Sequence, residues 1–336
     1  MNRRATIKDI AEQAGVSAKT VSRVMNDEPY VRDDIRERVK RVAAALDYHP
    51  NRNAQGLISS RTFLIGLTYE RPSPSYVVDL QRGALERLAG ERYRLVVLPF
   101  ADAREDPAGL VALLRSAMVD GALLAPPSCD IPEVLDALDN SGIRYARITP
   151  GTMLERGSCA LLDERAAGRA IAEHLVQLGH RRFGVILGHP GHAATSARLA
   201  GYRDAFAAAG IAPDDIRIER GDFTFHSGEA AAHRLLARTD RPTAILAQND
   251  DMGAAALSVA RALGLAVPDA VSIAGFDDAD IARLCWPQLT TVEQPVAAIA
   301  ADATDRLLKQ LEGGELAAAI THPHRVIVRG STGPAA

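Results

Sequence analysis

Apolar side chains recur at helical spacing in three stretches near the beginning of the chain. They predict two helices within residues 6–26 and a third over Asp33–Leu46. Thr6, with an acidic residue three positions later, can cap the first helix, and Ser17 can cap the second. Between them, Gly15 can adopt the positive φ of a tight turn. The inward positions are Ile7, Ile10, Ala11, Ala14, Val21 and Val24, then Ile35, Val39, Val42, Ala43 and Leu46.

Beyond Arg61 the pattern changes to short apolar runs that alternate with helical stretches. The runs cover 63–68, 94–100, 121–125 and 144–148, then 182–187, 216–221, 243–248 and 271–276. This alternation is typical of two doubly wound parallel sheets, whose ligand sites lie at the carboxyl ends of the strands. The predicted fold is therefore an all-α helix-turn-helix headpiece followed by an α/β core of two parallel-sheet subdomains.

The outward side of the second predicted helix carries short and basic side chains. Ala18, Lys19, Ser22 and Arg23 could reach base edges and phosphates in a DNA groove. The alternative is a small amphipathic helical hairpin without a DNA-binding role. The charge distribution favours the DNA-binding interpretation. Residues 1–61 hold 12 basic and 8 acidic side chains, whereas the rest of the chain has a net charge of −7.

Two segments resemble the LacI/GalR family of bacterial transcription regulators. They are AGVSAKTVSRVMN in the headpiece and PNRNAQGL at 50–57, which resembles the hinge of that family. The resemblance implies DNA contacts from Thr6, Ser17, Ala18, Lys19, Thr20, Ser22, Arg23, Asn26, Asn51, Arg52, Ala54 and Leu57. The chain departs from the family before the third helix, where Val31 and Arg32 replace the usual Ser or Thr cap. Asp33 and Asp34 place compensating negative charge on the first turn.

The hinge segment 51–59 is too short to form a stable isolated helix, since even about 12–15 residues are marginal. We expect it to fold only when paired with its dimer mate on DNA. The resemblance makes Leu57 a wedge that parts a base step in the minor groove and kinks the duplex. The alternative is a linker leucine that packs on the core.

The resemblance also implies the paired subdomains of periplasmic sugar-binding proteins, with chain crossings near 161, 291 and 322. The expected divisions are 1–49 for the headpiece, 50–61 for the hinge, 62–336 for the core, 62–161 with 292–321 for the N-subdomain, and 162–291 with 322–336 for the C-subdomain.

Polar residues that follow predicted strands are the candidate effector site. Sugar hydroxyls are bound by carboxylates, amides and guanidinium groups, with an aromatic ring against the C–H face. By resemblance the sugar-contacting residues are Arg198, Phe223, Asn249, Asp277 and Gln294. Each could instead be a helix cap or a strand-end hydrogen bond, and we interpret Asp250 as such a cap. Arg198 and Asp277 could also form a structural salt bridge.

The N-terminal half of the cleft is less ordinary. Tyr69 and Tyr76 could line its mouth, and Arg147 and Thr149 stand where many relatives have a short apolar segment ending in an acid. A guanidinium in the cleft would favour an acidic or larger saccharide. Alternatively, Arg147 pairs with a neighbouring acid and never contacts the ligand. A nucleobase effector also remains open.

Other classes of protein are disfavoured. The chain has no dinucleotide-binding, phosphate-loop, zinc-protease or nucleophile-elbow motif, so we expect no enzyme and no cofactor. The pairs His189/His192 and His322/His324 lack accompanying cysteines, and no metal is expected there. Its beginning lacks a secretory segment and no apolar run approaches about 18 residues, so a cytoplasmic location is expected. The cysteines are widely spaced, and we expect them to be buried thiols; they are Cys129, Cys159 and Cys285.

These features predict a homodimeric repressor that binds a palindromic operator and is released when a small sugar closes the cleft. A corepressor that tightens DNA binding would use the same parts. A stand-alone sugar-binding protein or sugar-processing enzyme is the rival class, which the headpiece disfavours. No leucine heptad follows the last predicted strand, HRVIVRG, so we expect a dimer rather than a tetramer.

Overall fold

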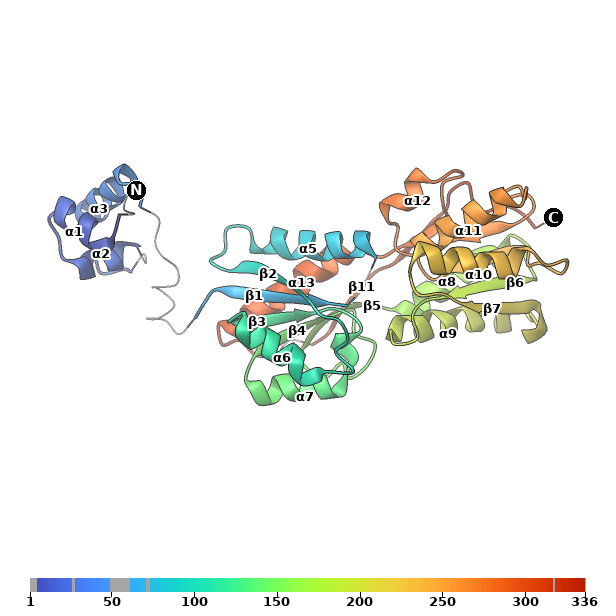
Figure 1. Ribbon diagram of the computed structural model, residues 1–336, viewed down its shortest axis with the longest axis horizontal. Coiled ribbons are helices and arrows are strands. Elements are labelled where there is room, and N and C mark those ends of the chain that lie inside the picture. Colours follow the sequence, from blue (N-terminus) through green and yellow to red (C-terminus); the bar gives the residue numbers. More distant parts are fainter. Residues whose placement is uncertain (1–4, 26–27, 49–60, 71–72, 317, 336) are drawn as a thin grey trace. The chain divides into compact units, whose positions relative to one another are not determined.

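The computed structural model describes residues 5–25, 28–48, 61–70, 73–316 and 318–335 (Figure 1). The chain divides into two compact units, residues 1–62 and residues 63–336, which are described separately below.

The first unit is a three-helix headpiece whose predicted caps are confirmed. Thr6 and Asp9 form a reciprocal capping box, in which the Thr6 amide donates to Asp9 Oδ2 at 2.7 Å. Gly15 ends the first helix with φ 63°, and the Ser17 hydroxyl accepts from the Thr20 amide at 3.1 Å. The helices are α1 (Ile7–Ala14), α2 (Ala18–Met25) and α3 (Asp33–Ala45). Their buried contacts are Ile10, Ala14, Val21, Val24, Val39 and Ala43.

Helix α3 forms without a side-chain cap, as the sequence predicted. Arg32 occupies the cap position and makes no capping hydrogen bond. Its guanidinium instead donates to both Asp34 carboxylate oxygens, at 3.0 and 2.7 Å, and this pairing lowers the pKa of Asp34. Asp33 and Asp34 on the first turn complement the positive end of the helix dipole.

The N-terminal sheet of the second unit has the strand order β11-β5-β4-β3-β1-β2, and all its pairs are parallel. Helices α5 and α13 pack together on one face and α6 with α7 on the other (Figure 1). The strands are β1 (Leu64–Tyr69), β2 (Arg94–Pro99), β3 (Gly121–Leu124), β4 (Arg144–Ile148), β5 (Ser158–Leu162) and β11 (Ile320–His322). The helices are α5 (Pro74–Leu88), α6 (Pro107–Ser116), α7 (Pro132–Ser141) and α13 (Val296–Leu311), with a 3₁₀ turn at Ser128–Asp130.

The C-terminal sheet is also parallel, with the order β7-β6-β8-β9. Helices α8 and α9 pack together, as do α10 and α11. The strands are β6 (Phe183–Leu187), β7 (Ile216–Arg220), β8 (Ala244–Ala247) and β9 (Ser272–Ala274). The helices are α8 (Glu164–Gln177), α9 (Ala193–Ala208), α10 (Phe225–Leu236), α11 (Asp250–Ala262) and α12 (Asp280–Leu284), with a 3₁₀ turn at Pro213–Asp215.

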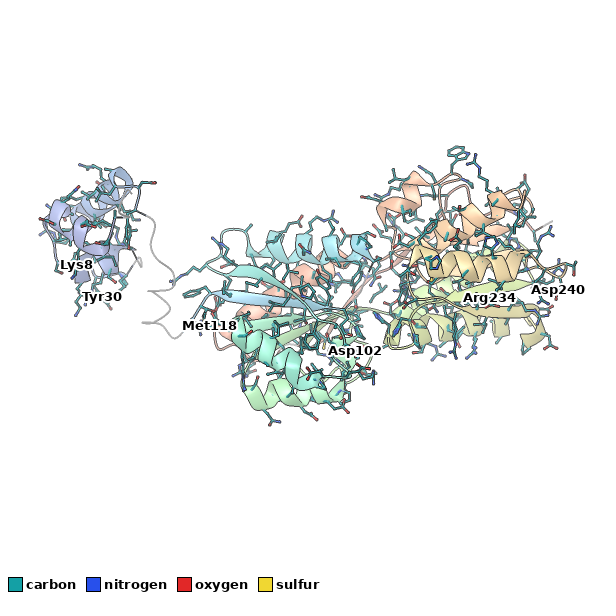
Figure 2. All side chains as sticks on the ribbon, in the orientation of Figure 1. Lys8, Tyr30, Asp102, Met118, Arg234 and Asp240 are labelled. Carbon is teal, nitrogen blue, oxygen red and sulfur yellow. The ribbon has the colours of Figure 1, made fainter. Side chains whose placement is uncertain are left out.

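Two later chain segments join the subdomains as an antiparallel ribbon. In it β10 (Thr291–Glu293) pairs with β12 (Arg325–Ile327). The carboxyl ends of the two parallel sheets point toward each other: Asp102 follows β2 on the side of the second subdomain, whereas Asp240 precedes β8 at the far end (Figure 2). This arrangement places the strand-end residues of both sheets around one cleft.

The eight strands predicted from apolar runs are all present, and the fold class is confirmed. β5 was not among the predicted strands, and it joins the N-terminal sheet at the place where a crossing was expected. Cys129 and Cys159 are buried as predicted, but Cys285 is only half-buried. Among the described residues, no helix is both long and apolar enough to span a membrane, and no cluster of potential metal ligands occurs.

Candidate functional site

A cleft lies at the carboxyl ends of both sheets. Its walls come from loops that follow the strands and from the first turns of α5, α8, α9 and α11. The lining residues are Ser73, Tyr76, Pro126, Thr149, Glu164, His192, Ala194, Arg198, Phe223, Asn249, Asp277 and Gln294. Six of the eight residues predicted for effector binding are therefore brought together here, and Tyr69 and Arg147 are not among them.

Arg198 is the buried cation of the cleft. Its guanidinium donates to both carboxylate oxygens of Glu164, at 2.7 and 3.1 Å, and to the main-chain carbonyl of Gln248. The guanidinium carbon lies 3.6 Å from the centroid of the Phe276 ring. Asp277 is farther away, with 3.9 Å between Arg198 Nη1 and Asp277 Oδ1. The main ion pair of Arg198 is thus with Glu164 rather than with Asp277.

Asp277 lies in the loop that follows β9, in an unusual backbone conformation. Its φ is 119° and that of Asp278 is 57°, and the Asp277 amide donates to the Val292 carbonyl at 2.8 Å. Burial raises the pKa of Asp277 to about 7, and the nearby Glu164 carboxylate adds to the effect, although Arg198 opposes it. The strained turn therefore holds a poorly solvated carboxyl group against the cleft.

Asn249, not Asp250, caps α11, which corrects the sequence interpretation. The Asn249 side-chain oxygen accepts from the Met252 amide at 3.1 Å, and its amide donates to the Phe223 carbonyl at 2.9 Å. Asp250 is buried one residue later and accepts from the Thr291 hydroxyl at 2.6 Å and the Ala279 amide at 2.8 Å. Burial, together with Asp277, raises its pKa well above the usual range. Asp250 therefore connects α11 to the Asp277 loop.

Phe223 and His192 form the aromatic part of the cleft. Their ring centroids are 5.3 Å apart in an edge-to-face arrangement. Phe223 has φ 58°, and its ring occupies the space that a Cβ on Gly188 would need, only 1.9 Å from Cζ. Burial, with contributions from His189 and Arg198, lowers the pKa of His192 to about 4, so this ring is neutral at pH 7.

The N-terminal wall presents hydroxyl groups. Tyr76 and Thr149 lie with their side-chain oxygens 3.2 Å apart, and Ser73 lies one residue before α5. Thr149 has φ 46°, which turns the chain just after β4. Tyr69 is not among the lining residues; it is half-buried at the end of β1 and packs against the main core.

Arg147 does not present its guanidinium to the cleft, which decides between the two alternatives left open by the sequence. It is fully buried and donates to Asp130 Oδ1 at 3.0 Å. It also donates to four main-chain carbonyls, those of Cys129, Thr152, Met153 and Arg156, at 2.6–3.1 Å. β4 is buried on both faces, so the guanidinium could face away from the cleft and hold together the loops behind Thr149.

Sequence reasoning missed five lining residues, Ser73, Pro126, Glu164, His192 and Ala194. Glu164 is the first residue of α8, immediately after the helix cap Asp163, and it meets Arg198 because α8 packs along α9. The sequence feature that could have pointed to Glu164 is the acidic pair Asp163–Glu164 at the start of α8. By itself such a pair is an ordinary helix start.

In the headpiece, the exposed residues of α2 form a candidate DNA-contacting surface. Ala18, Lys19 and Arg23 are exposed, and Arg23 Nε lies 3.4 Å from a carboxylate oxygen of Glu28. Thr6 and Ser17 are also exposed, while Thr20 and Ser22 are half-buried. The predicted contacts Asn26, Asn51, Arg52, Ala54 and Leu57 lie outside the described residues.

A helix-turn-helix unit joined to a two-subdomain α/β unit with a polar interdomain cleft defines a class of DNA-binding regulators that carry a small-molecule site. Residues 6–51 match the family described as bacterial regulatory proteins, lacI family, and residues 172–332 match the periplasmic binding protein-like domain. The chain belongs to the LacI family of bacterial regulatory proteins, and it is a DNA-binding transcriptional regulator.

Individual relatives support this assignment over nearly the whole chain. It is 32% identical to the HTH-type transcriptional regulator DegA of Bacillus subtilis (strain 168), over 98% of this chain and 99% of the relative. It is 34% identical to the HTH-type transcriptional regulator CelR of Thermobifida fusca, over 93% of each chain. Among solved structures, a lac repressor dimer bound to operator and the anti-inducer ONPF has a TM-score of 0.86 at 26% identity, covering 98% of this chain and 100% of that one.

Proposed function

We propose that this regulator represses carbohydrate-utilisation genes and is released from a palindromic operator by a small sugar. The observation that carries the proposal is the convergence of Asp277, Asn249 and Arg198 beside the ring of Phe223 in one cleft. Carboxylate, amide and guanidinium groups next to an aromatic face are the chemistry that binds a ring bearing several hydroxyls. Gln294 and Tyr76 add further polar contacts to the same site.

Relatives with sugar ligands support the proposal. One similar structure, at 32% identity, a TM-score of 0.74 and coverage of 98% of this chain and 100% of that chain, is a complex of the regulator CelR with cellobiose. In this chain we propose that the sugar binds in the cleft as a ligand and is not chemically converted there. The protein acts in the cytoplasm, where its operator DNA is located.

DNA recognition is assigned to α2 and the hinge. Lys19 and Arg23 contact bases or phosphates, Ala18 leaves steric room beside them, and Leu57 enters the minor groove. The remaining proposed contacts are Thr6, Ser17, Thr20, Ser22, Asn26, Asn51, Arg52 and Ala54. We retain the division into headpiece 1–49, hinge 50–61 and core 62–336 as part of this proposal.

A homodimer places two headpieces on the two halves of the operator. Leu284 and Trp286 are each 82% exposed near α12, which is the kind of apolar surface that a second copy would cover. Sugar bound in the closed cleft favours one arrangement of the subdomains, and the hinges then separate. The ligand can do this only through its different affinities for the two states.

The test is fluorescence-anisotropy binding of the full-length protein to an operator obtained by in vitro selection, repeated across a panel of sugars. We expect tight binding that one sugar releases, and no release for Asp277→Asn. DNA binding that requires an added ligand would show a corepressor instead. Absence of specific DNA binding in every condition would refute the proposal.

A further inference from the structure

We infer that the effector carries no anionic group, and that Glu164 is the residue that excludes anions by occupying Arg198. The inference rests on the proposed function, because it specifies the charge class of the ligand of that same cleft. An Arg147 guanidinium in the cleft would have favoured an acidic saccharide. The inference is the opposite: the cleft disfavours a negatively charged ligand.

The first step is that Arg198 is already engaged. A guanidinium has five N–H donors, and four of those on Arg198 have acceptors within the protein. The acceptors are the two Glu164 carboxylate oxygens, the Gln248 carbonyl and, at 3.4 Å, the side-chain oxygen of Gln294. The side chain of Arg198 is only 5% exposed. A ligand phosphate or carboxylate would have to displace Glu164 to gain a bidentate contact.

The second step is the charge that remains after this pairing. Glu164 neutralises Arg198, and Asp277 is left as an additional acidic group whose side chain is 16% exposed to the cleft. Burial raises the pKa of Asp277, and the nearby Glu164 carboxylate adds to the effect although Arg198 opposes it. A ligand anion placed a few ångströms from this carboxylate would bind more weakly by roughly tenfold or more.

The third step is that no other lining residue in the described part of the chain supplies a positive charge to balance the carboxylates. The N-terminal wall offers the hydroxyl groups of Ser73, Tyr76 and Thr149, which carry no positive charge at neutral pH. The low pKa of His192 leaves its ring uncharged. Hydroxyl groups of a ligand, by contrast, can donate to Asp277 and accept from the wall hydroxyls. The cleft therefore fits an uncharged polyhydroxyl ligand.

The experiment removes the charge of Glu164 and asks whether an anion then binds. Full-length wild type, Glu164→Gln and the matched control Glu173→Gln, a change farther along α8 at an exposed pair with Arg169, are titrated with inorganic phosphate. The ring resonances of His192 report binding in the cleft. We expect no binding to wild type or to Glu173→Gln. We expect phosphate to bind Glu164→Gln at least about tenfold more tightly than wild type, because one opposing charge is lost and one of the two oxygens that hold the guanidinium is removed.

Two results would overturn the inference: phosphate binding in the wild-type cleft, or no gain in phosphate affinity for Glu164→Gln. If that variant does not fold, Asp277→Asn removes the other carboxylate of the cleft and keeps the Arg198–Glu164 pair. A gain in phosphate affinity is still required, and it should be smaller because the guanidinium stays occupied. Operator release by the sugar panel is scored separately. Release by a sugar phosphate or sugar acid alone would overturn the inference and leave the proposed function standing. Failure of every sugar would instead refute the proposed function, while the phosphate titration would still decide the role of Glu164.

Discussion

Replacing Arg147 with methionine should destabilise the core rather than alter a direct ligand contact. The guanidinium is fully buried and connects the 3₁₀ turn at Ser128–Asp130 to the loop over residues 149–156. Methionine has a similar length but can donate no hydrogen bond. The change therefore leaves Asp130 without its cation and several carbonyls without the guanidinium donor.

The size of the effect follows from these contacts. Removing one partner of a buried ion pair usually costs about 3–5 kcal/mol in the free energy of unfolding. Asp130 keeps other donors, since its carboxylate accepts from the Gly151 amide at 3.0 Å and from the Thr152 amide and hydroxyl, each at 3.2 Å. The Met153 carbonyl likewise keeps the Arg156 amide at 2.9 Å, whereas the described contacts give the Cys129 carbonyl no second donor. We therefore expect a loss of about 3–4 kcal/mol.

Urea unfolding followed by circular dichroism measures this loss, with Arg238→Met as the control. Arg238 donates to Asp240 on the surface at 2.7 and 3.0 Å, at the end of the second subdomain remote from the cleft (Figure 2). Its loss should leave the unfolding midpoint unchanged, because exposed ion pairs are screened by water. The structural role of Arg147 would be refuted by an Arg147→Met protein whose free energy of unfolding lies within about 1 kcal/mol of wild type and which prefers a different effector.

Three further outcomes are expected. Arg23→Ala should weaken operator binding and leave effector binding unchanged, as anisotropy and calorimetry would show; equal operator affinity would remove Arg23 from the DNA-contacting set. Gly188→Ala should force the Phe223 ring out of its position and weaken effector binding several-fold at unchanged operator affinity, since a Cβ would lie 1.9 Å from that ring. Effector affinity should also fall as pH drops below 7, by up to roughly tenfold per unit, because the pKa of Asp277 is about 7 and sugar hydroxyls donate to its ionised form. Asp277→Asn should abolish that slope, and a persisting slope would exclude Asp277 as its source.

The sequence predicted the headpiece helices and most strands because local signals specify them. Thr6 and Ser17 are caps next to apolar positions at helical spacing, and the runs of the two sheets are continuous because both faces of a parallel sheet are buried. Because both faces are buried, the sequence does not show toward which face of the sheet a given side chain points. Around Arg147 four consecutive residues of β4 are buried, so no alternation of polar and apolar positions reveals which face the guanidinium takes.

The parts that sequence reasoning missed depend on contacts between distant segments. Glu164 reaches Arg198 only through the packing of α8 on α9. Asn249 and Asp250 are both good helix-capping residue types, and the choice between them follows from Thr291, which offers its hydroxyl to Asp250. Such partnerships have no periodicity along the chain, so a single sequence cannot rank them.

The position of α13 has a consequence for how the protein is made. This helix belongs to the N-terminal sheet, yet it is synthesised after the whole C-terminal sheet. It lies so close to α5 that a Cβ on Gly83 would be 1.9 Å from the Ala297 carbonyl oxygen. At about 5–20 residues per second, on the order of 10–40 s separate the emergence of these two helices from the ribosome. Throughout that interval the side of α5 that packs on α13 lacks this partner, so the subdomain encoded first is completed only after the second sheet has been synthesised.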